Sequence, residues 1–470
     1  MDLRIDPSSE VTQKEDSTTT RGQSETFWFN LDLASPPRSV LSPLTESLVE
    51  IFLNNACKDA MKILCPSFHH DSTLIRLRYG RAFINISCLE QLAIRRFSIS
   101  SSGISYLLKG ESRIAAEAPL LTTKYLLLNL RLLTGVPREI IGLRDALKER
   151  LDEYSIIRRE VFERPVSDWD PEAFLSKLQR LFNSLRSSLV LYLVITGEML
   201  LNYLYLLETY RRWIRYPETE DILLGLIDSS PGLAELEQNR TLWKLGQETS
   251  SDPAVQAWVS QGNAELSNAP KNVKETEFWM RLHDFLAKFG HHGPGHADLA
   301  NPRWNDNLPG LLEVIWRFKD SPDPRRDVMA QNKANNTSYS PNNRIFRNWS
   351  NFLLLFKRIF FRQILIRTGV INSLWKESKD HLLLQLDACR FLYLELGRKL
   401  VRNGVLDLEE DIFQLKAHEI EDLLSGKPRE YLRELIKARR SRNEQLESLV
   451  VPSQITSTFQ PANPHLNTQR

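Results

Sequence analysis

Helical periodicity dominates the sequence between residues 124 and 447 and limits the fold more than any other feature. Apolar residues recur at spacings of three and four, with charged residues between them, in the segments 124–151, 171–215 and 373–403. This period places the apolar side chains on one face of a helix. The sequence therefore predicts a mainly α fold of several helices that pack through their apolar faces.

One short stretch has a different period. Residues 73–89 alternate apolar and polar side chains around Gly80, which is typical of a strand or a short hairpin. We therefore predict a single small β element near residues 74–87 within an otherwise helical protein.

Composition divides the chain into five parts. Polar ends predict a disordered leader at 1–26 and a disordered tail at 451–470, and a segment rich in Pro, Asn, Asp and Ser predicts a linker at 321–344. Between them lie a helical subdomain at 27–320 and a helical arm with C-terminal helices at 345–450. Within the arm, residues 346–366 and 373–403 are expected to form an αα-hairpin or an extended coil.

The most unusual stretch is the loop at 290–309, which follows an amphipathic run and places three histidines around a Gly-Pro-Gly turn. In a packed interior each polar side chain of this loop would need a hydrogen-bond partner. We therefore expect the loop to face a cleft. Tyrosines between residues 192 and 210 are candidates for its apolar wall. The candidate binding residues of the loop are His291, His292, His296, Asp298, Arg303 and Trp304.

The three histidines allow other interpretations. No second cluster of Cys or His lies nearby in sequence and no HExxH motif is present, so we assign no metal ligands and no cofactor. A structural alternative is that the glycines end the preceding helix while the imidazoles bond to backbone carbonyls. A third is an independent enzyme with His291 or His292 as general base, although no partner nucleophile is visible from spacing.

Charge and cysteine content narrow the function classes. The 61 basic and 59 acidic side chains give a net charge of +2, which offers no electrostatic argument for nucleic acid. The 4 cysteines form no CxxC pair, which favours a reducing compartment and a cytoplasmic protein. The apolar run 188–207 contains Glu198 and Asn202, so we interpret it as a core helix and predict no membrane partner.

Three segments resemble one enzyme group. The loop GHHGPGHADLANPRWNDN is similar to a Gly-His-Arg-Gly-Pro-Gly-Glu loop followed by Pro-Arg-Trp, found in the central helical region of phosphoenolpyruvate-utilising dikinases of the rifampicin phosphotransferase and phosphoenolpyruvate synthase-like group. The stretch around Gly80 and Arg81 and the segment 383–447 resemble the same region, and the resemblance implies a strand at Asp411–Leu415. The resemblance adds Arg81 to the substrate-binding candidates. His292 and His296 depart from it, because they replace an Arg and a Glu of the group's loop.

The resemblance covers most of residues 28–450, which implies the helical region that receives the acceptor substrate. No glycine-rich phosphate loop and no Gly-Gly-x-x-Ser-His type motif is visible in the sequence. The resemblance thus implies a binder of a small organic acceptor, not catalytic alone, that needs separate ATP-grasp and phosphohistidine-domain proteins for phosphoryl transfer. The alternative is a non-catalytic small-molecule binder or a helical interaction scaffold.

Overall fold

The computed structural model describes residues 26–31, 40–64, 73–88, 125–162, 170–213, 233–261, 265–319, 321, 352–426 and 431–459. The prediction of a mainly α fold is confirmed, because helices account for most of these residues and one small antiparallel sheet accompanies them. The predicted leader, apart from residue 26, and residues 322–344 of the predicted linker lie outside the described residues.

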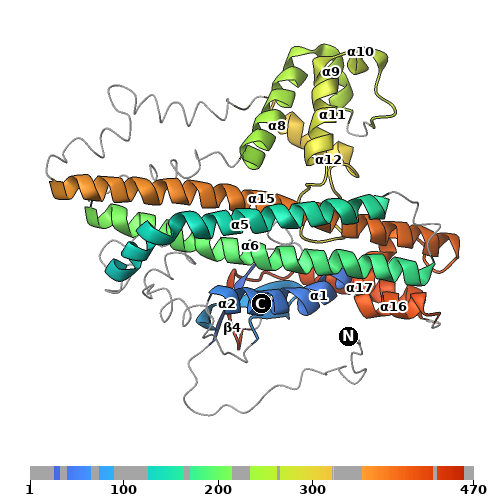
Figure 1. Cartoon of the computed structure of the whole chain (residues 1–470). Coiled ribbons are helices and arrows are strands. Elements are labelled where there is room, and N and C mark those ends of the chain that lie inside the picture. Colours follow the sequence, from blue (N-terminus) through green and yellow to red (C-terminus); the bar gives the residue numbers. More distant parts are fainter. Residues whose placement is uncertain are drawn as a thin grey trace, which may run out of the picture.

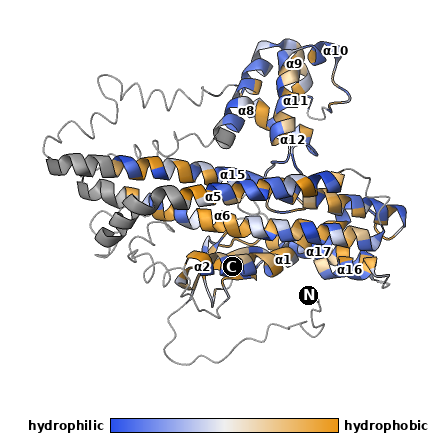
Figure 2. Ribbon diagram, in the orientation of Figure 1, coloured by the Kyte–Doolittle hydropathy of each residue, from blue (hydrophilic) through white to orange (hydrophobic). Residues whose placement is uncertain are grey.

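Three long helices form the body of the molecule: α5 (Tyr125–Phe162), α6 (Pro171–Trp213) and α15 (Phe352–Arg402). They lie side by side and each contacts the other two (Figure 1). Hydrophobic and hydrophilic residues are interspersed along the coloured parts of these helices (Figure 2), as expected of helices with one apolar face. The apolar faces meet in two buried clusters. Leu181 of α6 and Leu392 of α15 belong to the larger one, and Leu147 of α5, Ile195 of α6 and Ile371 of α15 belong to the other.

Among the described residues, α6 is the one helix long and apolar enough by length and composition to cross a membrane. Core helices of soluble proteins pass the same test, so this finding alone is weak evidence. In this fold α6 packs against α15, α5 and α2 (Asn54–Leu64). Its Glu198 pairs with Arg367 of α15 at 3.3 Å.

A four-stranded antiparallel sheet lies on one side of the long helices, close to two short helices, α1 (Pro43–Leu48) and α2. A π-helical turn (Val49–Leu53) joins α1 to α2. The strands are β1 (Phe27–Asn30), β2 (Ile75–Arg78), β3 (Arg81–Asn85) and β4 (Gln454–Thr456), in the order β2-β3-β1-β4. Trp28, Phe83 and Ile455 form a small buried cluster on the sheet.

The predicted β element is the hairpin of β2 and β3. Tyr79 and Gly80 connect the strands with φ angles of 53° and 67°, which are the two consecutive positive values of a type I′ turn. Glycine takes such values without strain.

A compact helical unit lies on the opposite side of α15 from the sheet (Figure 1). It has a core of its own, built around Trp258, Phe278, Phe285 and Leu311. Its helices are α8 (Leu233–Ser251), α9 (Pro253–Val259), α10 (Lys271–Lys274), α11 (Glu277–Phe289) and α12 (Leu308–Arg317).

The chain after α15 folds back onto the long helices. It forms a 3-10 helix, η5 (Glu409–Gln414), followed by α16 (Ala417–Leu424) and α17 (Leu432–Glu447). Arg439 of α17 donates to both carboxylate oxygens of the buried Glu419, at 2.6 and 3.0 Å. This two-point pair fixes α17 against α16.

Three details of the sequence analysis are wrong. Of the two forms expected for the arm, an αα-hairpin or an extended coil, the hairpin is wrong: Phe352–Arg402 is one continuous helix, α15, because Ile371 and Leu374 are buried across the expected break. The predicted tail at 451–470 instead begins with residues that form β4 and pair with β1. The Asp411–Leu415 segment, expected to be a strand from the resemblance, is largely the 3-10 helix η5.

The close contact between α15 and η5 generates a prediction. A Cβ atom added at Gly397 would lie 2.3 Å from the backbone oxygen of Glu409, whereas one at Gly142 in α5 would meet nothing within 4 Å. We expect Gly397→Ala to lower the free energy of unfolding by about 1–3 kcal/mol. Gly142→Ala, its matched control, should leave stability unchanged or raise it by up to about 1 kcal/mol. Urea denaturation measures both, and equal stabilities of the two variants would contradict the contact.

Candidate functional site

The histidine loop, defined here as residues 290–307, connects α11 to α12 and doubles back on itself. The N–H of Gly290 bonds to the oxygen of Leu286 at 2.8 Å and ends α11. The N–H of Trp304 then donates to the oxygen of His292 at 2.8 Å, and that of Asn305 to Gly290 at 3.0 Å. These two bonds clamp the two ends of the loop together, so the histidines leave α11 in a fixed direction.

The helix α15 holds the loop from one side. Arg390 of α15 donates to the backbone oxygens of Leu299 at 2.6 Å and Ala300 at 3.2 Å, and its Nε donates to Asp306 at 3.0 Å. Its side chain is almost fully buried. A guanidinium suits this task because it presents several donors in one plane.

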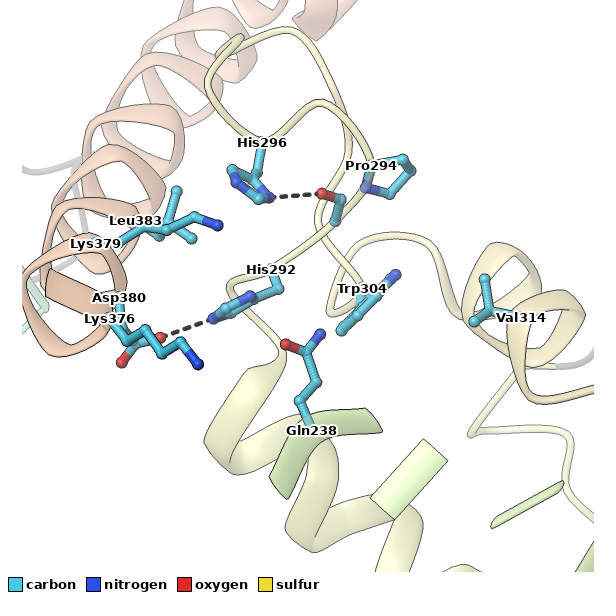
Figure 3. Close-up of a pocket in the computed structure, with 11 residues that line it drawn as sticks. Gln238, His292, Pro294, His296, Trp304, Val314, Lys376, Lys379, Asp380 and Leu383 are labelled. Carbon is cyan, nitrogen blue, oxygen red and sulfur yellow. Dashed lines mark hydrogen bonds and ion pairs between the residues drawn. The ribbon is translucent and has the colours of Figure 1, made fainter. Parts of the chain in front are cut away.

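A cavity of about 280 Å³ lies between the loop, α8, α12 and α15. Both α15 and the histidine loop contribute polar and apolar side chains to its walls (Figure 3). The lining residues are Gln238, His292, Gly293, Pro294, His296, Trp304, Val314, Lys376, Lys379, Asp380 and Leu383.

Two imidazoles meet one carboxylate at the edge of this cavity. The Nε2 atoms of His291 and His292 lie 3.0 and 2.8 Å from Oδ1 of Asp380 on α15. Burial raises the pKa of the Asp380 carboxyl, but hydrogen bonds from His291 and His292 outweigh burial and hold that pKa well below its usual range. Asp380 is therefore a carboxylate at neutral pH, and the three side chains form a group that could hold a metal ion.

His296 is a neutral imidazole that lines the cavity. Burial lowers its pKa to about 4, against a smaller opposing effect of its hydrogen bond to Gly293. The Nδ1 atom lies 2.9 Å from the oxygen of Gly293 (Figure 3). Because a carbonyl only accepts hydrogen bonds, Nδ1 carries the proton and Nε2 carries the lone pair.

The remaining walls combine cations with apolar surface. Lys376 and Lys379 project from α15 on the same side as Asp380 (Figure 3). Trp304, Val314 and Leu383 provide apolar surface, and the ring of Trp304 stacks on that of His292 with an interplanar angle of 19°. Such a cavity fits a small organic molecule that combines an anionic group with an apolar part.

Asp298 does not line the cavity, although we expected it at the wall of a cleft. It is 2% exposed and anchors the loop to the start of α1. Its carboxylate accepts from the N–H and hydroxyl of Ser42 at 2.7 and 2.6 Å, and from the hydroxyl of Thr45 at 2.8 Å. Asp298 thus ties the loop to a segment more than 250 positions away in sequence.

The two arginines among the predicted binding residues also lie away from the cavity lining. Arg303 is buried, donates to the backbone oxygens of Asn301 and Asp298, and has its Nε 4.0 Å from Asp387. Burial lowers the pKa of Arg303 to about 10, partly offset by Asp387, so it stays charged at neutral pH. Arg81 is buried in β3 and donates to the oxygen of Tyr79, and it is not among the residues that line the cavity.

The structure thus brings His292, His296 and Trp304 of the predicted set together around the cavity, with His291 directly behind His292. Of the tyrosines expected as a wall, neither Tyr192 nor Tyr203 lines the cavity, and Tyr192 instead stacks on Trp375. The side chains of Tyr205 and Tyr210 lie outside the described part of the structure. The sequence analysis missed the contribution of α15. Its spacing carried a signal, because Lys376, Lys379, Asp380 and Leu383 share one helical face.

The histidine loop lies in a part of the chain that is similar to a known protein family. Residues 192–368 match the protein family described as "Rifampicin phosphotransferase fourth domain", so the chain contains a rifampicin phosphotransferase fourth-domain region. This match covers α8 to α12 and the histidine loop, and it ends inside α15 before Lys376.

Distant relatives are uncharacterised mycobacterial proteins. The chain is 22% identical over 240 residues to the uncharacterized protein Rv2047c of Mycobacterium tuberculosis and, to the same extent, to the uncharacterized protein Mb2073c of Mycobacterium bovis. The similarity spans 50% of this chain and 24% of each relative. The matched half of this chain therefore spans about a quarter of the length of these relatives.

The anchoring role of Asp298 is testable. We expect Asp298→Ala to lower the free energy of unfolding by roughly 2–4 kcal/mol, because it removes the acceptor of the buried Thr45 hydroxyl and of the Ser42 N–H. Asp284→Ala, at an exposed position of α11, should change it by less than about 0.5 kcal/mol. Chemical denaturation measures both. A change at Asp298 as small as that at Asp284 would exclude the anchor.

Proposed function

We propose that the cavity beside the histidine loop binds a small organic acceptor and that the chain is the acceptor-binding region of a dikinase-like phosphotransferase. One observation carries the proposal. The cavity lies at the loop of the rifampicin phosphotransferase fourth-domain region and is lined by imidazole, lysine and carboxylate side chains together with apolar ones.

The lining side chains suit an acceptor of this kind. Lys376 and Lys379 would attract a carboxylate or phosphate group of the ligand, and Leu383, Val314 and Trp304 would cover its apolar part. The Nε2 lone pair of His296 would accept a hydrogen bond from the hydroxyl that receives the phosphoryl group. In phosphoryl transfer the protein contributes mainly positioning and charge stabilisation, so such a binding region has a defined task without catalysing the reaction alone.

The phosphoryl donor would come from other parts. We propose that separate ATP-grasp and phosphohistidine-domain proteins, or corresponding parts of a longer polypeptide, supply the activated phosphoryl group. The match covers only 24% of each mycobacterial relative, so those proteins have room for further domains beside the region that resembles this chain. A cytoplasmic location without a membrane or nucleic-acid partner remains part of this proposal.

A second candidate is a non-catalytic binder or an interaction scaffold. It draws support from Asp298, Arg303 and Arg390, which are all used for contacts that hold the loop in place. A scaffold needs the loop but not the cavity. Filling the cavity without disturbing the loop therefore separates the two candidates.

The test is a cavity-filling substitution. Val314→Trp places a large side chain into the cavity wall, whereas Met280→Trp adds the same side chain at a position 61% exposed on α11. Ligand-observed NMR with a library of hydroxylated aromatic and aliphatic carboxylates should detect binding to the wild type. We expect Val314→Trp to weaken ligand binding at least about tenfold, because the tryptophan side chain would fill part of the cavity and leave less room for the ligand. Met280→Trp should leave ligand binding unchanged.

Circular dichroism and melting temperature establish that both tryptophan variants are folded. An acceptor site is contradicted if the library yields no ligand for the wild type, or if its ligands bind Val314→Trp as tightly. Either result leaves the scaffold as the better account.

A further inference from the structure

The group formed by His291, His292 and Asp380 has a geometry that acceptor binding does not explain. One donor atom from each side chain, two imidazole nitrogens and one carboxylate oxygen, lie within 4.8 Å of one another. Both Nε2 atoms approach the same oxygen, Oδ1 of Asp380, at 3.0 and 2.8 Å. Two neutral or cationic rings and one carboxylate thus converge on one point from two elements of the fold.

The fold holds these donors in place before any ligand arrives. His291 and His292 follow the last turn of α11, and the backbone there is fixed by the bonds from Trp304 to His292 and from Asn305 to Gly290. Both histidine side chains are about nine-tenths buried, with exposed fractions of 7% and 11%. Preorganised, buried imidazoles lose little freedom on binding an ion, which favours coordination.

We propose that His291, His292 and Asp380 form a binding site for a divalent first-row transition metal such as Zn²⁺. Two imidazoles and one carboxylate are a donor set that suits Zn²⁺ and Fe²⁺. In the structure the carboxylate bridges the two rings through hydrogen bonds, and a bound ion would take the place of their protons. This inference is independent of the proposed acceptor function.

The cavity defines the open side of the site. His292 and Asp380 line it, so coordination positions not filled by protein face the cavity and would take water or an anionic ligand. Lys376 and Lys379 border the same cavity and repel a cation. We therefore expect micromolar rather than nanomolar affinity for the metal alone, and tighter binding when inorganic phosphate is present.

Titration of the full chain with metal tests the proposal. After treatment with a chelator, isothermal titration calorimetry with ZnCl₂ should show one site, and CoCl₂ should give the visible absorption bands of a cobalt ion bound to nitrogen and oxygen. Asp380→Asn and His292→Gln should each weaken Zn²⁺ binding at least about tenfold and change the cobalt spectrum. His283→Gln, at an exposed position of α11, is the matched control and should leave both unchanged.

Two results of these titrations would rule out the proposed metal site. Absence of Zn²⁺ and Co²⁺ binding to the wild type, or binding that survives in His292→Gln and Asp380→Asn, overturns the proposal. The second result would assign the ion to other histidines of the chain. Asp380→Asn keeps the size of the side chain, and circular dichroism of each variant separates a lost ligand from a lost fold.

Discussion

The packing of α15 against α6 and α5 is the contact on which the rest of the structure depends. The face of α15 that carries Ala388, Leu392 and Leu396 is buried in the core of the long helices. This burial fixes both the direction and the rotation of a helix of 51 residues. With that rotation set, another face, with Lys376, Asp380 and Leu383, lies at the cavity.

The histidine loop is positioned from three directions. Arg390 holds it to α15 through backbone oxygens, Asp298 holds it to Ser42 and Thr45 before and within α1, and its own ends are clamped at Gly290 and His292. Most of its polar side chains therefore make contacts that hold the loop in place. The ones that border open space, above all His292 and His296, are those in which this loop departs from the loop it resembles.

Much of the fold could be predicted from sequence because its signals are local. The periods that indicate α5, α6 and α11 and the turn at Gly80 each act over a few residues. The pairing of β1 with β4 could not be predicted, because it joins residues more than 400 positions apart and β4 is only 3 residues long. The continuity of α15 was missed because tertiary packing of Ile371 overrides the weak helix propensity around it.

In the site, too, local features could be predicted from sequence and long-range contacts could not. The loop was found because its composition is unusual, but the sequence does not show which of its polar side chains turn inward as anchors. Asp298 and Arg303 form buried contacts, whereas His292 reaches the cavity. The partner of His292, Asp380, lies 88 positions further along the chain, and only the fold brings the two together.

The contact between His292 and Asp380 joins the histidine loop and α15 into one site. A double-mutant cycle with His292→Gln, Asp380→Asn and the combined variant, measured by urea denaturation in the presence of a chelator, tests it most directly. We expect a coupling energy of about 1–2 kcal/mol between the two side chains, because either single substitution already breaks the bond between them. Additive effects of the two substitutions would contradict it.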